Sequence, residues 1–353
     1  MKVDRSINPG WAVPVVARIS HRVPATAADA PHPAGFSRFG VLDVLSSTTP
    51  RPLGRKPSWA RRLAALATKP GQICGLAAIA LCTCGCSSIV SSATGNLADS
   101  LTTAVLEQND PETVRQGAPT YLLLIDGLIA DSPENVDLLL AGAGLYSSYA
   151  SAFVDDPERA SRLAEKGRDY GWRALCQRDK RACGSWSAPY DDFERIINDM
   201  GIKRVPVLYG SGAAWATWIQ KNTDDWKAIA DKARVDAMMQ RVVALDETYE
   251  GGAAYLYLGI LATLLPEAMG GQPEKGRADF ERVIELSDGR NLMAKVLLAR
   301  NYARLVFDRK LHDRLCREVI DADPVAPGLT LVNTVAQGEA AALLETSEDY
   351  FGD

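Results

Sequence analysis

Histidine is scarce in this chain of 353 residues, and its scarcity limits the chemistry that the protein can carry out. The three histidines are His21, His32 and His312, and only His312 lies in the part expected to fold. One histidine cannot build a site that needs two imidazole ligands, and no CxxC spacing supports zinc. His312 lies within a helical pattern and is interpreted as an ordinary surface or core residue. We therefore expect no metal, no cofactor and no enzymatic activity.

Long hydrophobic runs are lacking as well. The apolar run at residues 73–82 is too short to span a hydrocarbon core about 30 Å thick. Its length is typical of the hydrophobic part of a signal peptide, and a basic flank precedes it. The run ends in Thr83-Cys-Gly-Cys86-Ser-Ser, which resembles a lipoprotein lipobox with Thr83 in place of the usual leucine. We predict lipidation of Cys86; the alternatives are a plain secretory signal cleaved nearby or a buried helix.

Acidic residues are few in the first 85 positions. Residues 1–85 carry 11 Lys/Arg and 3 Asp/Glu, a net charge of +8, so the total of -5 leaves -13 for the rest. An acidic body argues against nucleic acid as a partner, because phosphate binding needs clustered Lys and Arg. Residues 1–60 contain eight prolines and no apolar period, so they are either disordered or never translated. The expected organisation is a leader at 1–60, a lipoprotein signal peptide at 61–85, a tether at 86–96 and a helical domain at 97–350.

The remaining sequence repeats one kind of helix start. Asp110-Pro-Glu, Ser132-Pro-Glu and Asp156-Pro-Glu each place a capping oxygen before a proline and an acidic residue in the first turn. Apolar residues then recur at helical spacing, and no credible pair of strands appears. The sequence therefore predicts an all-α fold. Helices are expected at residues 97–108, 112–130, 134–153, 158–177, 190–199, 206–221, 226–248, 252–265, 274–286, 292–306, 309–321 and 330–346.

Helices of this length cannot bury an apolar face alone, so they must stack. Tyr255-Leu-Tyr-Leu-Gly259 resembles the first helix of a TPR unit, in which a small residue lets the partner helix approach. The second helix keeps the matching spacing at Gly276, Phe280, Val283 and Leu286. The loop at residues 266–273 is longer than a standard TPR turn. We therefore expect stacked helical hairpins that form a TPR-like α-solenoid variant rather than a regular array.

Cysteine usage fits export from the cytoplasm. Four of the seven cysteines fall in or beside the predicted signal, which leaves Cys176, Cys183 and Cys316. Cys176 and Cys183 flank a charged, turn-prone stretch at residues 177–182. In an oxidising periplasm these two are candidates for a local disulfide. The competing interpretation is a pair of unbonded thiols.

Several motifs occur in a characteristic order along the chain. They are Asp110-Pro-Glu112, Gly117-Ala-Pro119, Ser132-Pro-Glu-Asn135, Tyr149-Ala-Ser-Ala-Phe153, Ala214-Trp215-Ala-Thr-Trp218, Leu245-Asp-Glu-x-Tyr249-x-Gly251, Leu265-Pro-Glu-x2-Gly270-Gly271-x-Pro273, Phe280-Glu-Arg-x-Ile284 and Leu331-Val-Asn333-x2-Ala336. Together they make residues 86–350 resemble the T component associated with TRAP transporters. The long leader and the imperfect lipobox depart from that family's pattern.

The resemblance implies a periplasmic lipoprotein of TPR-like hairpins and a homotrimer. It also implies a partnership with the transporter's periplasmic solute-binding protein and a largely apolar ligand pore. Ser87 follows the predicted lipid-bearing Cys86, where an aspartate would retain the protein in the inner membrane under the enteric sorting pattern. We therefore favour the outer membrane, with the protein facing the periplasm.

Aromatic side chains are the natural candidates for an apolar ligand pocket that has a few polar points. The candidates, with two polar residues near helix starts, are Tyr146, Tyr149, Trp215, Trp218, Tyr255, Asn135 and Asn333. The competing interpretations are core packing for the aromatic residues and helix capping for the asparagines.

The sequence is compatible with two functions. The first is an accessory lipoprotein of a TRAP-type system that binds a small apolar or amphipathic molecule. The alternative is a TPR scaffold lipoprotein that assembles envelope proteins by docking peptides in a groove. A tunnel lined by apolar residues favours the first, whereas an open polar groove favours the second.

Overall fold

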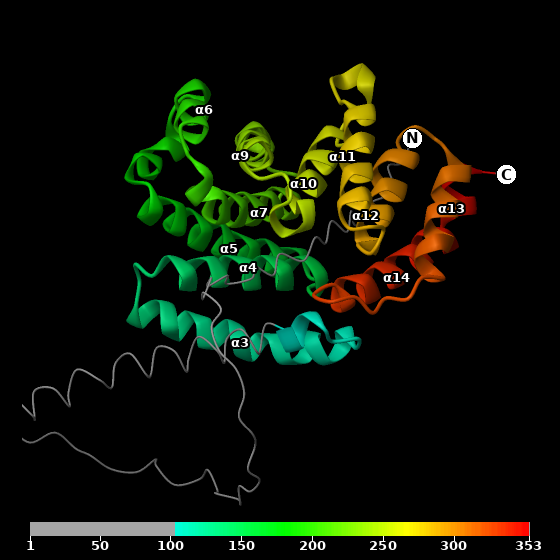
Figure 1. Cartoon of the computed structure of the whole chain (residues 1–353), viewed down its shortest axis with the longest axis horizontal. Coiled ribbons are helices and arrows are strands. Elements are labelled where there is room, and N and C mark those ends of the chain that lie inside the picture. The colour runs from blue at the N-terminus through cyan, green and yellow to red at the C-terminus, as the bar shows by residue number, and fades with distance from the viewer. Residues whose placement is uncertain (1–102, 353) are drawn as a thin grey trace, which may run out of the picture. The chain divides into compact units, whose positions relative to one another are not determined.

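The computed structural model describes residues 103–352, and every regular element among them is a helix (Figure 1). The predicted all-α class is therefore confirmed for this part of the chain. The predicted leader, signal peptide and tether, with Cys86, lie outside the described residues.

The helices follow one another with short connections. They are α3 (Pro111–Asp131), α4 (Val136–Ala152), α5 (Pro157–Arg178), η2 (Lys180–Ser187), α6 (Tyr190–Asn198), η3 (Ile202–Arg204), α7 (Val205–Lys221), α8 (Trp226–Ala230), α9 (Lys232–Leu245), η4 (Tyr249–Gly252), α10 (Ala253–Ala262), η5 (Glu267–Met269), α11 (Pro273–Leu286), α12 (Leu292–Leu297), η6 (Leu298–Ala303), α13 (Arg309–Ile320), α14 (Thr330–Glu345) and α15 (Ser347–Phe351).

Two of the three predicted helix starts are confirmed. The carboxylates of Asp110 and Asp156 cap α3 and α5 by accepting hydrogen bonds from backbone N–H groups of the first turn. The predicted start at Ser132 is wrong, because the backbone N–H of Ser132 still bonds to Leu128 and ends α3. Asn135 caps α4 instead, accepting hydrogen bonds from the N–H groups of the next turn.

The helix predicted over residues 226–248 is interrupted at Asp231, so that prediction is wrong in its continuity. The Asp231 carboxylate accepts a hydrogen bond from the Trp215 indole at 3.3 Å and another from Arg234 at 3.1 Å. These bonds to α7 and to the first turn of α9 hold the corner between α8 and α9. Helical periodicity alone could not reveal this corner, because apolar positions continue before and after Asp231.

Further departures concern short or irregular helices. The segment η6 is a π-helix inside the predicted helix 292–306, and η2 and α15 were not predicted at all. The segments η2 and α15 are eight and five residues long, too short to show an apolar period.

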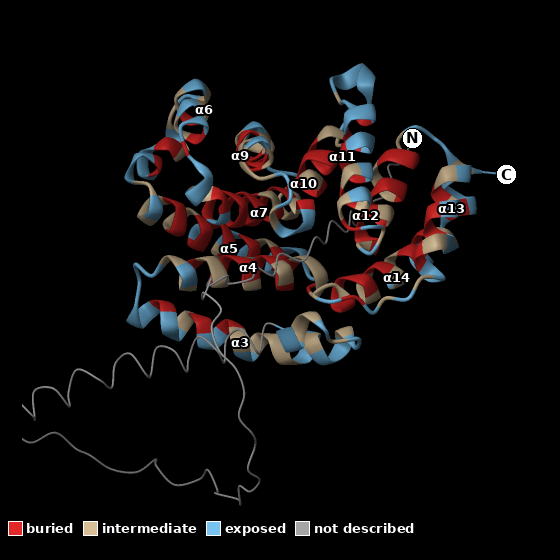
Figure 2. Ribbon diagram, in the orientation of Figure 1, coloured by how far each residue is buried: buried red, intermediate tan, exposed pale blue. Residues whose placement is uncertain are grey.

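Helices that are near one another in the chain pack side by side through small residues. The helix α4 packs against α5, α5 against α7, and α10 against α11. A Cβ atom at Gly259 of α10 would lie 2.7 Å from the Phe280 ring of α11, so only glycine permits this approach. The buried stripes of α4, α5 and α7 face one another in Figure 2. In this arrangement α8, α9 and the end of α10 surround a cleft.

Candidate ligand cleft

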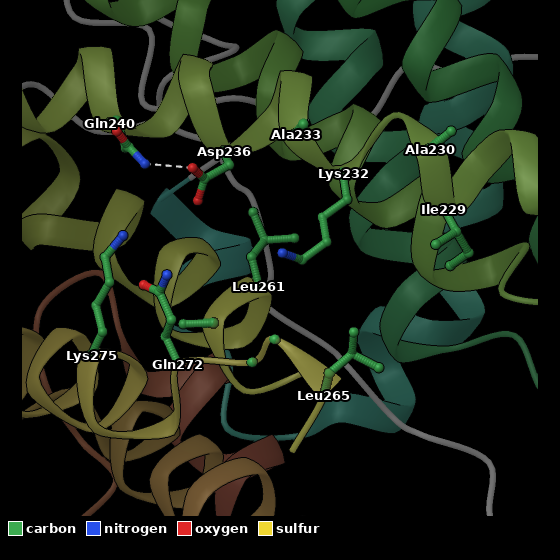
Figure 3. A pocket seen from close by; sticks show the side chains of 13 residues that line it. Ile229, Ala230, Lys232, Ala233, Asp236, Gln240, Leu261, Leu265, Gln272 and Lys275 are labelled. Atoms are coloured by element: carbon green, nitrogen blue, oxygen red, sulfur yellow. Dashed lines mark hydrogen bonds between the residues drawn. The ribbon is translucent and has the colours of Figure 1, made fainter. Parts of the chain in front are cut away.

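A cleft of about 390 Å³ lies between α8, α9, the end of α10 and the start of α11 (Figure 3). Its apolar surface comes mainly from Ile229 of α8, Leu261 of α10 and Leu265 of the following loop. Such a volume suits a small organic molecule, since ligand pockets measure about 300–1,000 Å³. We call this space the cleft.

Polar side chains line the cleft as well. Lys232, Asp236 and Gln240 come from α9, and Gln272 and Lys275 come from the start of α11. The Gln240 amide donates a hydrogen bond to the Asp236 carboxylate. The side chains of Lys232 and Lys275 extend toward the same space from different helices in Figure 3. The cleft therefore combines apolar surface with two positive charges and one negative charge.

The loop after α10 gives the cleft its wall because it contains two adjacent glycines. Gly270 has a φ of +88°, a backbone conformation that favours glycine. A Cβ atom at Gly271 would lie only 1.7 Å from the Leu265 carbonyl oxygen. The Gln272 N–H then donates to the carbonyl oxygen of Ala262 at 2.9 Å and closes the loop back on α10.

A smaller space of about 40 Å³, which we call the slot, lies between α7, α8 and α10. Ile229 and Leu261 line both the slot and the cleft, so they form a common wall. The slot is largely apolar, with Ile219, Ile260 and Leu264 among its lining residues. A space of this size also has room for a water molecule.

Tyr257 of α10 lines the slot and is 4% exposed. Its hydroxyl has no hydrogen-bond partner among the described residues. A buried hydroxyl without a partner is costly, about 1–3 kcal/mol. Tyr257 therefore brings a buried polar atom without a partner to the residues around the slot.

Asp279 on α11 is a second buried polar group near the cleft. It is 8% exposed, and its Oδ2 atom has no hydrogen-bond partner among the described residues. Burial raises the pKa of Asp279 to about 6, Lys275 lowers it and Asp236 raises it further. The charges that line the cleft thus act electrostatically on a carboxylate buried behind them.

A third space, of about 680 Å³, is an open hollow at the turns before α5 and after α7. Six of its thirteen lining residues are charged, namely Asp155, Glu158, Arg162, Lys221, Asp224 and Asp225. No group of three or more His, Cys, Asp or Glu side chains suited to a metal ion occurs within residues 103–352.

The five predicted aromatic candidates pack against protein groups. Tyr146 donates a hydrogen bond to Asp126 at 2.7 Å, and Tyr255 donates one to Glu247 at 3.2 Å. Tyr149 packs near Phe153, and Trp215 is 1% exposed within a group of aromatic rings. Trp218 lies under the Arg168 guanidinium at 4.0 Å.

The two asparagine candidates have different surroundings. Asn135 is exposed and caps α4. Asn333 is fully buried, and its amide bonds to the backbone of Leu292, Arg290 and Pro324. Neither asparagine, and none of the five aromatic candidates, is among the residues that line the cleft, the slot or the open hollow. Their role as ligand contacts stays a prediction.

Sequence reasoning missed the residues that line the cleft. It noted Gly270 and Gly271 as part of a long loop and a family motif, but not as a pocket wall. Lys232, Asp236 and Lys275 carry no signature, because isolated charged residues on helices are ordinary in sequence. Tertiary packing brings them together, because α10 packs against both α9 and α11.

Cys176 and Cys183 form a disulfide in the structure, with their Cα atoms 4.7 Å apart. This link closes a loop that contains the first half of η2, residues 180–183. At the end of η2, Trp186 stacks on Trp215 with ring centroids 5.0 Å apart, and the Arg168 guanidinium lies 4.5 Å from the Trp186 ring. Cys316 is a buried free cysteine.

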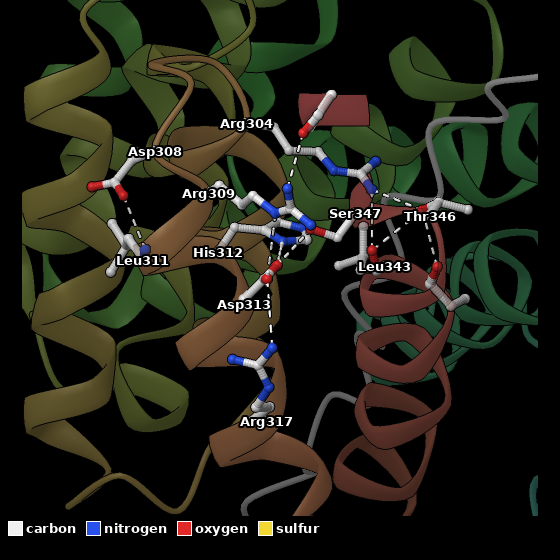
Figure 4. Close-up of polar contacts among 12 residues, drawn as sticks. Arg304, Asp308, Arg309, Leu311, His312, Asp313, Arg317, Leu343, Thr346 and Ser347 are labelled. Atoms are coloured by element: carbon white, nitrogen blue, oxygen red, sulfur yellow. Dashed lines mark hydrogen bonds and ion pairs between the residues drawn. The ribbon is translucent and has the colours of Figure 1, made fainter. Parts of the chain in front are cut away.

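His312 is a packed core residue of α13 (Figure 4). Its Nδ1 atom lies 3.0 Å from Asp313, and the Ser347 hydroxyl donates to the same carboxylate at 2.6 Å. A nucleophilic serine needs its hydroxyl bonded to the histidine ring rather than to the aspartate. These contacts attach α15 to α13 and do not form a catalytic triad.

These observations define a helical protein over residues 103–352, with a partly apolar cleft. Residues 107–351 match the family described as TRAP transporter T-component, and the chain belongs to this family. It is also 25% identical, over 266 residues, to an uncharacterized protein from Treponema pallidum (strain Nichols). That match covers 70% of this chain and 82% of the relative.

Membership of this family associates the protein with a TRAP transport system at the cell envelope, and the family is not one of enzymes. Within residues 103–352, no helix has both the length and the apolar character needed to cross a membrane.

Proposed function

We propose that this protein is a periplasm-facing accessory lipoprotein of a TRAP-type system that holds a small apolar or amphipathic molecule in the cleft. The observation that carries this proposal is the cleft itself, which has apolar surface from α8, α10 and the loop after α10, together with five polar side chains. Family membership supports the link to transport. The lipid on Cys86 and a location at the outer membrane belong to the same proposal.

We further propose that the helical pairs are TPR-like and that the protein forms homotrimers. The close approach of α10 and α11 at Gly259 supports the first point, because TPR units also pair helices across a small residue. Exposed apolar side chains on α3 support self-association or contact with the solute-binding protein. They are Leu123, Leu124 and Leu128, which are 74%, 54% and 43% exposed.

The scaffold alternative would use a polar groove that docks peptides. The open hollow at the turns before α5 and after α7 is the feature that favours this alternative, because six of its thirteen lining residues are charged. The cleft favours the ligand-binding function, because its size and mixed surface suit a small molecule better than a peptide.

Native mass spectrometry of the purified protein, followed by extraction of bound small molecules, tests the proposal. We expect a bound small molecule and co-purification with a periplasmic solute-binding protein. Substituting Leu261→Trp, which fills the common wall of cleft and slot, should reduce the bound molecule without removing the partner. Reproducible absence of both ligand and solute-binding protein would contradict the proposed function, and capture of peptides in the open hollow would favour the scaffold.

A further inference from the structure

Two lysines in the cleft have no counter-ion in contact with them. Neither Lys232 nor Lys275 forms an ion pair or a side-chain hydrogen bond with another residue of the described range 103–352. By contrast, Lys166 pairs with Asp126 and Lys295 pairs with Glu318. The cleft therefore contains two ammonium groups free to contact an anion.

Positive charge exceeds negative charge among the residues that line the cleft. The charged ones are Lys232, Lys275 and Asp236, which gives the lining a net charge of +1. Asp236 keeps its negative charge while it accepts a hydrogen bond from Gln240, and Asp279, which does not line the cleft, adds a further negative charge near Lys275 above its pKa of about 6. A charged head group that accepts hydrogen bonds from both ammonium groups gains charge-assisted bonds, which are stronger than neutral ones.

The apolar surface continues away from the lysines. Ile229 and Leu261 line both the cleft and the slot, and Tyr257 is among the residues that line the slot beyond them. The Ile229 side chain belongs to α8, a helix of five residues. A narrow chain that moves these two side chains apart would pass from the cleft into the slot.

We propose that the cleft and the slot together bind a single-chain amphiphile with an anionic head, either a carboxylate or a phosphate. The head lies between Lys232 and Lys275, and the tail passes Ile229 and Leu261 toward Tyr257. This inference rests on the proposed ligand-binding function. It adds the charge of the ligand's head and the orientation of head and tail in the site.

Titration calorimetry of the full chain with four amphiphiles that each contain one ten-carbon chain tests this inference. The probes are decanoate, decyl phosphate, decyltrimethylammonium and decyl glucoside, each kept below its micelle concentration. We expect the two anionic probes to bind at least about tenfold more tightly than the cationic and neutral probes. The ratio between decanoate and decyl phosphate tells which head the site prefers.

Substitutions then locate the head and the tail. Lys232→Gln and Lys275→Gln should each weaken binding of the anionic probes about tenfold and leave decyl glucoside unchanged. Lys310→Gln is the matched control, because Lys310 is an exposed lysine of α13 outside the cleft. Ile229→Trp should weaken all probes that bind, since it narrows the passage to the slot. Thermal melting establishes that each variant is folded.

Equal affinity for the four heads, or anion binding that both lysine variants leave unchanged, overturns the anionic head while keeping a ligand-binding cleft. Failure of all four probes, together with no molecule extracted from the purified protein, overturns the proposed function as well. The two failures are therefore distinguishable.

Discussion

At the residue scale, Asn333 shows how a buried polar side chain joins distant segments. Its amide bonds to the backbone of Leu292 at the start of α12, of Arg290 just before α12, and of Pro324 after α13. We expect Asn333→Ala to lower the free energy of unfolding by about 3 kcal/mol, because three buried backbone groups lose their partner. Asn135→Ala, which removes only a helix cap, should cost about 1 kcal/mol.

Urea denaturation measures both losses. A variant Asn333→Ala that keeps its stability but releases the bound molecule would show that the asparagine contacts ligand rather than holding the backbone.

Asp279 makes the folded protein less stable as the pH rises, which is the opposite of the effect of most acidic residues. Its folded pKa of about 6 lies above the ordinary value of 3.8. The stability that its protonated form contributes is present in full below pH 3.8 and is lost as the pH rises through about 6. We therefore expect Asp279→Asn to stabilise the protein by about 1–3 kcal/mol at pH 7.5, with the gain shrinking toward pH 4.

Denaturation at several pH values tests this prediction, with Asp224→Asn as a control at an exposed position. A stability gain for Asp279→Asn that does not change between pH 7.5 and pH 4 would contradict the assigned cause.

At the scale of elements, the disulfide and η2 act together. The link between Cys176 and Cys183 holds the loop that seats Trp186 on Trp215 and Arg168. We expect Cys183→Ser to lower the free energy of unfolding by about 2–3 kcal/mol. Tryptophan emission should shift to longer wavelength, because Trp186 becomes more exposed to water.

Wild-type protein treated with a reductant should reproduce that shift, whereas the variant should not respond to reductant. Peptide mapping that finds both thiols free in protein purified from the periplasm would instead support the unbonded interpretation.

Strongly periodic helices could be predicted from the sequence, and interruptions could not. The bounds of α5, α7 and α11 agree with the prediction to within one residue, because proline or apolar spacing marks them. The corner at Asp231 depends on a hydrogen bond from Trp215, sixteen positions earlier in the chain. A contact between residues so far apart in the chain produces no periodic pattern in the sequence.

At the scale of the whole molecule, the order of the motifs along the chain was more informative about the family than any single residue. The motifs from Asp110 to Ala336 predicted the family, and the match over residues 107–351 confirms it. The candidate site was not predictable in the same way. It needs side chains from α8, α9, α10 and α11 to meet, and their meeting depends on tertiary packing.

Attachment of the whole molecule to the envelope is tested at Cys86. We expect Cys86→Ser to move the protein from the membrane fraction to the soluble fraction, because the lipid is the proposed anchor. Cys84→Ser, two positions earlier, is the matched control and should remain in the membrane fraction. Fractionation followed by immunoblotting measures both, and release of both variants or of neither would contradict the assignment of Cys86.

The shortness of helix α8 affects how fast a molecule enters and leaves the slot. Because it spans only Trp226–Ala230, it is held by few backbone hydrogen bonds, and its local opening costs far less than global unfolding. Ile229 is carried by this helix and closes one side of the slot. Residence time of an occupant in the slot should thus follow the opening rate of α8, so stiffening this helix would slow both arrival and departure and leave the equilibrium nearly unchanged.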